Sequence, residues 1–259
     1  IMKEELKCKL PKWYKSINSD NYYLVLSNDF DSYFSCLLLN RLTGIQIGGY
    51  FSLNDGLYLN SKYSKEKEPI YVDLSITHGK CFDNHLTIIK NSECINPNII
   101  TQDYYRKYNG STLSFLCSLY DRDLSEYSDK QLNIMIAIDG WFAGYYKYNG
   151  KFRDTTIQWM KLFEVDKYLI PLLETHDTEF FYHFIDDYQL NSKIIIKNNH
   201  LYCSKKIYIP TCKFELVQKT IRSNLSKNQV ENIYNTDSNS IITAAETFRN
   251  QYSICRKVV

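Results

Sequence analysis

The first half of the chain alternates short apolar runs with segments of helical periodicity, and this alternation limits the folds that it can form. The run YYLVL at residues 22–26 is followed by a turn and then by apolar residues at helical spacing as far as Leu42. A second run, PIYVDLS at residues 69–75, has the continuous apolar character of a buried strand. Strands that alternate with helices predict an α/β fold with a mostly parallel amino-terminal sheet flanked by helices.

Two domains are expected from the length of 259 residues and from a change of pattern near residue 150. Residues 1–150 form the predicted α/β domain, with helices near residues 111–120 and from Asp129 to Ala137, the second capped by Ser128. Residues 151–190 are predicted to be a helical connector. Residues 191–259 contain two hairpin patterns, one with an Asn-Asn turn, and predict a smaller mixed α+β domain rich in strands.

Composition excludes few functions. The net charge of +2 neither requires nor excludes a polyanionic partner. The eight cysteines include no C-x-x-C pair, which argues against a zinc ribbon. No apolar run approaches the roughly 18 residues of a membrane span. We therefore expect a soluble, cytoplasmic protein with reduced thiols and no membrane partner.

Aspartates gather at or just beyond the ends of the predicted strands and helices of the first domain. They are Asp29, Asp31, Asp73, Asp83 and Asp139. Because the carboxyl ends of parallel strands meet at one edge of a sheet, these carboxylates are expected to converge. Like charges repel strongly unless a cation neutralises them, so convergence predicts a bound divalent metal. Oxygen ligands favour Mg²⁺ or Mn²⁺ over zinc.

Four short motifs occur in an order that resembles a known family. They are SNDFDS at residues 27–32, YVDLS at residues 71–75, FDNHLT at residues 82–87 and IAIDGWF at residues 136–142. In this order they are similar to the motifs of the DHH phosphoesterases. That family includes RecJ-like single-strand exonucleases, hydrolases of nano-RNA and of linear dinucleotides, and family II pyrophosphatases. The third motif is Asp-Asn-His here instead of Asp-His-His.

The resemblance implies a set of roles for the residues that match. Asp29, Asp31, Asp73 and Asp139 would bind the metal, which would be Mn²⁺ or Mg²⁺. Asp83 and His85 would form the catalytic group, with His85 close to the substrate phosphate. The second domain would close over the substrate. The implied activity is metal-dependent hydrolysis of phosphodiester or phosphoanhydride bonds in short single-stranded nucleic acid, nucleotides or dinucleotides.

The chain departs from the family at its imidazole ligands. Asn84 occupies the position of the first histidine of the DHH triplet, and Val25 and Ser27 occupy the positions where a metal-binding histidine commonly precedes the first Asp-x-Asp. Loss of nitrogen ligands favours Mg²⁺ over Mn²⁺. A second hypothesis is therefore a catalytically lapsed relative that binds a nucleotide, a nucleic acid or a protein without cleaving it.

The substrate-binding candidates are Asn84, Arg106, Arg249 and Arg256. Asn84 lies within the third motif. Arg106 stands among three tyrosines, in YYRKY at residues 104–108, which suits base stacking and phosphate contact, although aromatic residues are more commonly core. Arg249 and Arg256 lie in the last predicted hairpin and would reach a phosphate if that hairpin closes over the site.

Structural roles compete with each of these predictions. Asp29 and Asp31 precede or begin an apolar helix, where a carboxylate caps free N–H groups and interacts favourably with the helix dipole. His85 suits a hydrogen-bonded structural histidine, and His78 a loop residue that could replace a missing ligand. A third hypothesis is a globular partner-binding domain in which the aspartates are only helix caps.

Overall fold

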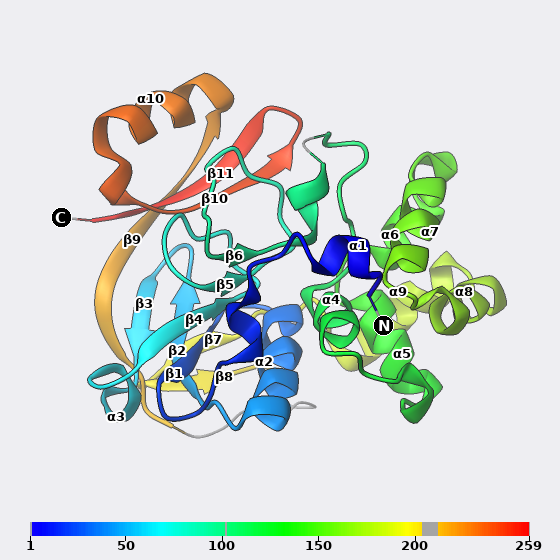
Figure 1. Ribbon diagram of the computed structural model, residues 1–259, viewed down its shortest axis with the longest axis horizontal. Coiled ribbons are helices and arrows are strands. Elements are labelled where there is room, and N and C mark those ends of the chain that lie inside the picture. The colour runs from blue at the N-terminus through cyan, green and yellow to red at the C-terminus, as the bar shows by residue number, and fades with distance from the viewer. Residues whose placement is uncertain (1, 102, 204–211, 259) are drawn as a thin grey trace.

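The computed structural model describes residues 2–101, 103–203 and 212–258, and most of its strands form one curled sheet (Figure 1). The strands are β1 (Tyr22–Leu26), β2 (Ile47–Ser52), β3 (Gly56–Leu59), β4 (Glu68–Val72), β5 (Cys81–Phe82), β6 (Cys94–Ile95), β7 (Ile195–Lys197), β8 (His200–Tyr202), β9 (Glu215–Ser226), β10 (Ile241–Phe248) and β11 (Gln251–Lys257). The large sheet has the strand order β10-β11-β9-β3-β2-β1-β4-β5-β6 within the described residues, and β7 and β8 pair separately.

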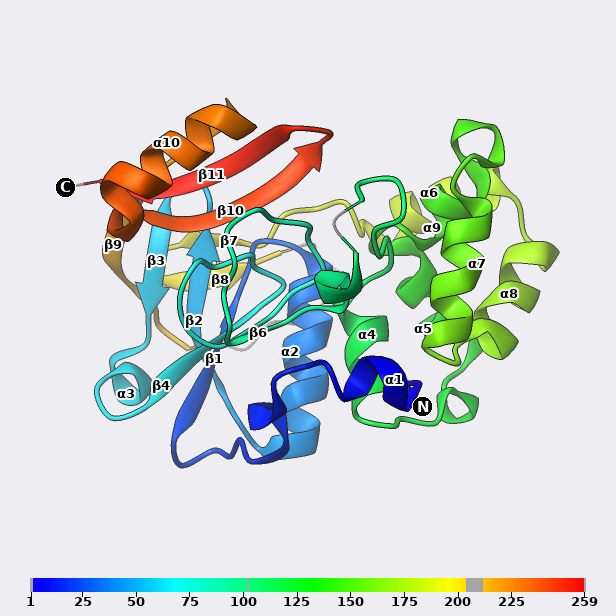
Figure 2. The ribbon, with the colours of Figure 1, turned by 45° about the horizontal axis from the view of Figure 1, so that its top comes forward.

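Helices cover the sheet and form a group beside it. The helices are α1 (Glu4–Lys7), α2 (Phe30–Thr43), α3 (Ser61–Ser64), α4 (Thr112–Leu119), α5 (Asp129–Ala137), α6 (Trp141–Tyr146), α7 (Arg153–Leu162), α8 (Asp166–Thr175), α9 (Thr178–Tyr188) and α10 (Lys227–Asp237). Short 3-10 turns are η1 (Lys12–Lys15), η2 (Pro97–Ile100), η3 (Leu124–Glu126), η4 (Tyr148–Gly150) and η5 (Ser238–Ser240). Helix α2 lies between the sheet and the group α4–α9, while α10 lies over β9–β11 (Figure 2).

The strands β2, β1, β4, β5 and β6 are mutually parallel, as the alternating sequence pattern predicts. Side chains of β1 alternate between two cores: Leu24 and Leu26 face the larger core with α2, whereas Tyr23 and Val25 face a smaller core. Burial on both faces explains why YYLVL is apolar throughout. The α/β class is confirmed, although the sheet is mixed because β3 runs antiparallel to β2.

The carboxy-terminal strands continue the same sheet. Strand β9 pairs antiparallel with β3 on one side and with β11 on the other. Strand β10 then returns to the loop after β4, where Thr77 N donates to Ile242 O at 2.9 Å and Ala244 N donates to Ser75 O at 3.1 Å. The predicted closing hairpin is thus β10–β11, and it meets the segment that follows β4. The domain boundaries at residues 150 and 190 stay a prediction.

Other local expectations agree with the structure in part. Strand β1 and helix α5 have the predicted bounds, and the Asn-Asn turn joins β7 to β8 with both asparagines at positive φ. Strand β4 ends at Val72, earlier than predicted, because Asp73 has a left-handed φ of 59°. The helical stretch after residue 150 divides into α7 and α8 at Glu164, where φ is 54°. Residues 204–209 of the first hairpin pattern lie outside the described residues.

Candidate functional site

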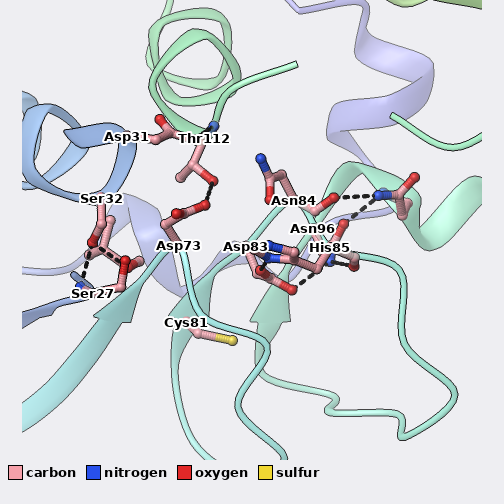
Figure 3. A network of polar contacts seen from close by, with 12 residues as sticks. Ser27, Asp31, Ser32, Asp73, Cys81, Asp83, Asn84, His85, Asn96 and Thr112 are labelled. Carbon is pink, nitrogen blue, oxygen red and sulfur yellow. Dashed lines mark hydrogen bonds and ion pairs between the residues drawn. The ribbon is translucent and has the colours of Figure 1, made fainter. Parts of the chain in front are cut away.

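Asp73 is the first residue beyond β4, and its side chain points into a buried polar cluster (Figure 3). Its backbone N–H donates to Phe82 O at 2.8 Å, which holds it beside the end of β5. Its Oδ1 accepts a hydrogen bond from Thr112 Oγ1 at 2.7 Å. A left-handed conformation at a residue other than glycine costs energy and persists only where the surroundings impose it. The fold therefore tolerates a local destabilisation at Asp73, and this conformation directs the carboxylate inward.

Asp31 is fixed in a different way, by the amino terminus of α4. Its Oδ2 accepts from Thr112 N at 2.7 Å, and its Oδ1 accepts from Leu113 N at 2.9 Å. These are N–H groups that a helix leaves without internal partners, at the positive end of its dipole. Figure 3 shows Thr112 between the Asp31 and Asp73 side chains. Asp31 thus ties α2 to α4.

Asp29 is the amino-terminal cap of α2. This is the structural role that the sequence offers as the alternative to metal binding. Its Oδ1 accepts from Ser32 N at 3.1 Å and is 3.4 Å from Ser27 Oγ. The side chain is only partly buried and lines a cavity together with Asp73 and His85. Asp29 therefore caps a helix and still faces the cluster.

Just beyond β5, the buried Asp83 pairs with His85, whose side chain is 42% exposed. Asp83 Oδ1 lies 2.7 Å from His85 Nδ1, and Asp83 Oδ2 accepts from Asn96 Nδ2 at 3.0 Å. Burial opposes protonation of His85, but the charge and hydrogen bond of Asp83 outweigh it and raise the pKa of His85 to about 10. Because Nδ1 is engaged, Nε2 is the ring atom left for a ligand or substrate.

Asn84 lies in the same motif but turns toward the helical side of the cluster. Its Nδ2 donates to Asp139 Oδ2 at 2.8 Å and to Gly110 O at 2.9 Å. Its backbone carbonyl accepts from Asn98 Nδ2 at 2.7 Å. The amide therefore stands beside a carboxylate that was predicted to bind metal.

Three of the four predicted metal ligands have raised pKa values, in part because of the charges of the other aspartates. Burial, followed by the charges of Asp73, Asp139 and Asp29, raises the pKa of Asp31 well above its usual range. Burial and the charge of Asp29 do the same to the pKa of Asp73. Burial also raises the pKa of Asp139 to about 6, against the opposing effect of His85. A bound cation would relieve this repulsion.

Three residues of the cluster could share one cation, and only Asp73 among them is one of the four predicted metal ligands. Ligand atoms of Asp73, Asp83 and His85 all lie within 4.8 Å of one another. Two carboxylates and one imidazole suit Mn²⁺ or Mg²⁺, with Asp29 facing the same space. The donor set therefore fits a hard divalent cation centred on Asp73.

A cavity of about 180 Å³ opens over this cluster. Asp29, Asp73 and His85 line it together with residues of β9–β11, including Arg222 and Ser253. Arg222 Nε donates to Ser253 Oγ at 2.8 Å, which restricts the orientation of the guanidinium. The cavity thus brings a cationic group and acidic groups to one space, as an anion bound through a metal would require.

The three predicted arginines lie elsewhere among the described residues. Arg106 is largely exposed and pairs with Asp103 at 3.7 Å. Arg249 stacks its guanidinium over the Tyr105 ring at 5.5 Å. Arg256 is partly buried on β11, and its Nε lacks a hydrogen-bond partner. None of the three lines the cavity over Asp73.

Sequence reasoning missed Thr112, Asn96 and Arg222 as site residues. Thr112 lies at the start of the helix predicted near residues 111–120, and a helix amino terminus near carboxylates is a usable signal. Asn96 and Arg222 carry no local signal, because they reach the site through the pairing of β6 with β5 and of β9 with β11.

Comparison with known proteins leaves the site to be interpreted from its own geometry. No protein-family model matches the chain, and neither a curated protein nor a solved structure matches it. In the part of the chain that the structure describes, every helix is too short or too polar to cross a membrane.

Proposed function

We propose that this protein is a metal-dependent phosphoesterase of the DHH type that hydrolyses phosphodiester or phosphoanhydride bonds in short oligonucleotides or nucleotides. The observation that carries the proposal is the cavity that Asp29, Asp73, His85 and Arg222 line together. The order of the four motifs and the parallel strands β2-β1-β4-β5-β6 support it. A cytoplasmic location is part of the same proposal.

The residues of the cavity suit separate tasks. Asp73, with Asp29 and Asp83 beside it, would hold the divalent cation, Mn²⁺ or Mg²⁺. Such a cation lowers the pKa of a bound water and neutralises charge on phosphoryl oxygens. Asp83 orients the His85 ring, so that Nε2 can donate a hydrogen bond to a phosphoryl or leaving-group oxygen. Arg222, which lines the same cavity, would bind a phosphate oxygen.

The proposal is tested by assaying single-stranded oligonucleotides and linear dinucleotides with Mn²⁺ and with Mg²⁺. We expect turnover that requires metal and is lost in Asp73→Asn. Asp20→Asn is the matched control, because Asp20 is exposed and outside the cavity. If the whole substrate panel stays intact with both metals, the proposed activity is refuted.

The second candidate function is a lapsed relative that binds a nucleotide, a nucleic acid or a protein without cleaving it. Two observations favour it: Asn84 donates to Asp139, and both oxygens of Asp31 accept bonds from α4. In that case these carboxylates are stabilised by hydrogen bonds and need no cation. Calorimetric titration with Mn²⁺ distinguishes the two candidate functions. Micromolar Mn²⁺ binding that disappears in Asp29→Ala supports the phosphoesterase. Absence of metal binding supports the lapsed protein.

A further inference from the structure

A second cavity, of about 480 Å³, adjoins the carboxylate cluster on its helical side. Its inner wall contains Asn84, His85 and Asp139. His85 also lines the smaller cavity over Asp73, so one imidazole borders both spaces. A ligand with its phosphate beside His85 could therefore extend directly into the larger cavity.

The outer wall of this cavity is rich in exposed aromatic rings. Tyr105 and Phe152 are nearly parallel, with ring centroids 6.2 Å apart and an interplanar angle of 11°. Tyr148 and Phe248 leave 70% and 66% of their surfaces exposed. Aromatic surface that remains exposed at an open cavity is typical of a ligand-binding site. The flat rings suit a flat ligand.

Cations stand against these rings. Lys107 Nζ lies 4.5 Å from the Tyr104 ring centroid, and Lys151 Nζ lies 4.6 Å from that of Tyr105. Burial lowers the pKa of Lys107, while Asp139 and Glu246 oppose the shift. Of the three tyrosines in YYRKY, Tyr104 and Tyr105 belong to the aromatic wall, whereas Tyr108 is buried against Trp141 and Trp159. Aromatic faces beside lysines match a base joined to a phosphate.

We propose that this cavity is a nucleobase subsite, in which the base attached to the phosphate at His85 stacks on the wall formed by Tyr105 and Phe152. The inference rests on the proposed function, because it takes the position of the phosphate from it. It adds that the substrate is a nucleotide recognised through its base, which distinguishes it from pyrophosphate or a sugar phosphate.

The test compares binding of AMP and of ribose 5-phosphate by ligand-observed NMR, with EDTA present so that neither metal nor turnover contributes. We expect AMP to bind more tightly than ribose 5-phosphate. The Tyr105→Ala variant should lower the affinity for AMP about 10-fold and leave the affinity for ribose 5-phosphate unchanged. Tyr105→Phe should retain AMP binding, because it retains the ring. Tyr234→Ala is the matched control: Tyr234 is 36% exposed and Tyr105 39%, and Tyr234 lies on α10.

Two results would overturn the subsite: equal affinities for AMP and ribose 5-phosphate, or unchanged AMP affinity in Tyr105→Ala. Thermal unfolding of each variant checks that the loss is local. The phosphoesterase activity can be refuted independently of the subsite. Absence of hydrolysis together with Tyr105-dependent AMP binding refutes the phosphoesterase and supports the subsite.

Discussion

Asp31 and Asp73 are both buried carboxylates of the same cluster, yet the fold treats them differently. Both oxygens of Asp31 accept hydrogen bonds from backbone N–H groups of α4, and this helix terminus offsets part of the burial and repulsion that raise the pKa of Asp31. Asp73 has one bond from a threonine hydroxyl, a left-handed backbone and a place on a cavity wall. The convergence of carboxylates therefore does not by itself identify which of them binds a metal. We infer that Asp31 is an anchor and Asp73 the principal metal ligand.

The largest expected effect is on catalysis by Asp73→Asn. Removing a principal ligand should lower metal-dependent hydrolysis at least about 100-fold, since the metal contributes several kcal/mol to transition-state stabilisation. The same variant should unfold at a higher temperature than the wild type in EDTA, because it removes a buried charge among like charges. Steady-state assays and calorimetry measure the two effects. A variant that keeps full activity would remove Asp73 from the site.

The next effect is on stability, in Asp31→Ala. Loss of two charge-assisted hydrogen bonds to α4 should cost roughly 2–4 kcal/mol of unfolding free energy. Urea unfolding in EDTA measures this cost, with Asp20→Asn expected to stay within about 0.5 kcal/mol of the wild type. If Asp31→Ala is as stable as the wild type but no longer binds Mn²⁺, Asp31 is a metal ligand and not an anchor.

A pH effect is expected at Asp139. Burial raises its pKa from 3.8 to about 6, so the folded state holds this proton more tightly than the unfolded chain. The resulting stabilisation is complete below about pH 4 and is lost as pH rises through about 6. Over this window, in EDTA, the wild type should lose stability relative to Asp139→Asn. Metal affinity should increase over the same range. A stability difference that is constant from pH 4 to 8 would contradict the shift.

The smallest expected effect is on metal preference, in Asn84→His. Imidazole is a better ligand than an amide for Mn²⁺, so the variant should bind Mn²⁺ more tightly and hydrolyse substrate faster with it. If the native oxygen set is tuned to Mg²⁺, the gain for Mn²⁺ comes at the expense of Mg²⁺. Parallel titrations with both metals measure the preference. No change in affinity or activity would mean that residue 84 does not face the metal, and that the match of DNH to the DHH motif is wrong.

Local patterns predicted several elements of the fold. Strand β1, helix α5, the Asn-Asn turn and the Asp29 cap each depend on neighbours within a few residues. The Asp31 bond to Thr112 joins residues 81 positions apart and has no local signal. Arg222 lies on β9, and the pairing of β9 with β11, which brings it to the cavity beside the carboxylates, depends likewise on the whole fold.

The most direct test of the central claim is a crystal soaked in Mn²⁺ and examined for anomalous scattering. We expect a peak in contact with the Asp73 carboxylate, shared with Asp29 or with Asp83, while Asp31 keeps its bonds to Thr112 and Leu113. A Mn²⁺ ion bound by Asp31 and not by Asp73 would show that Asp73 is not the principal ligand, as would an absence of Mn²⁺ from the whole cluster.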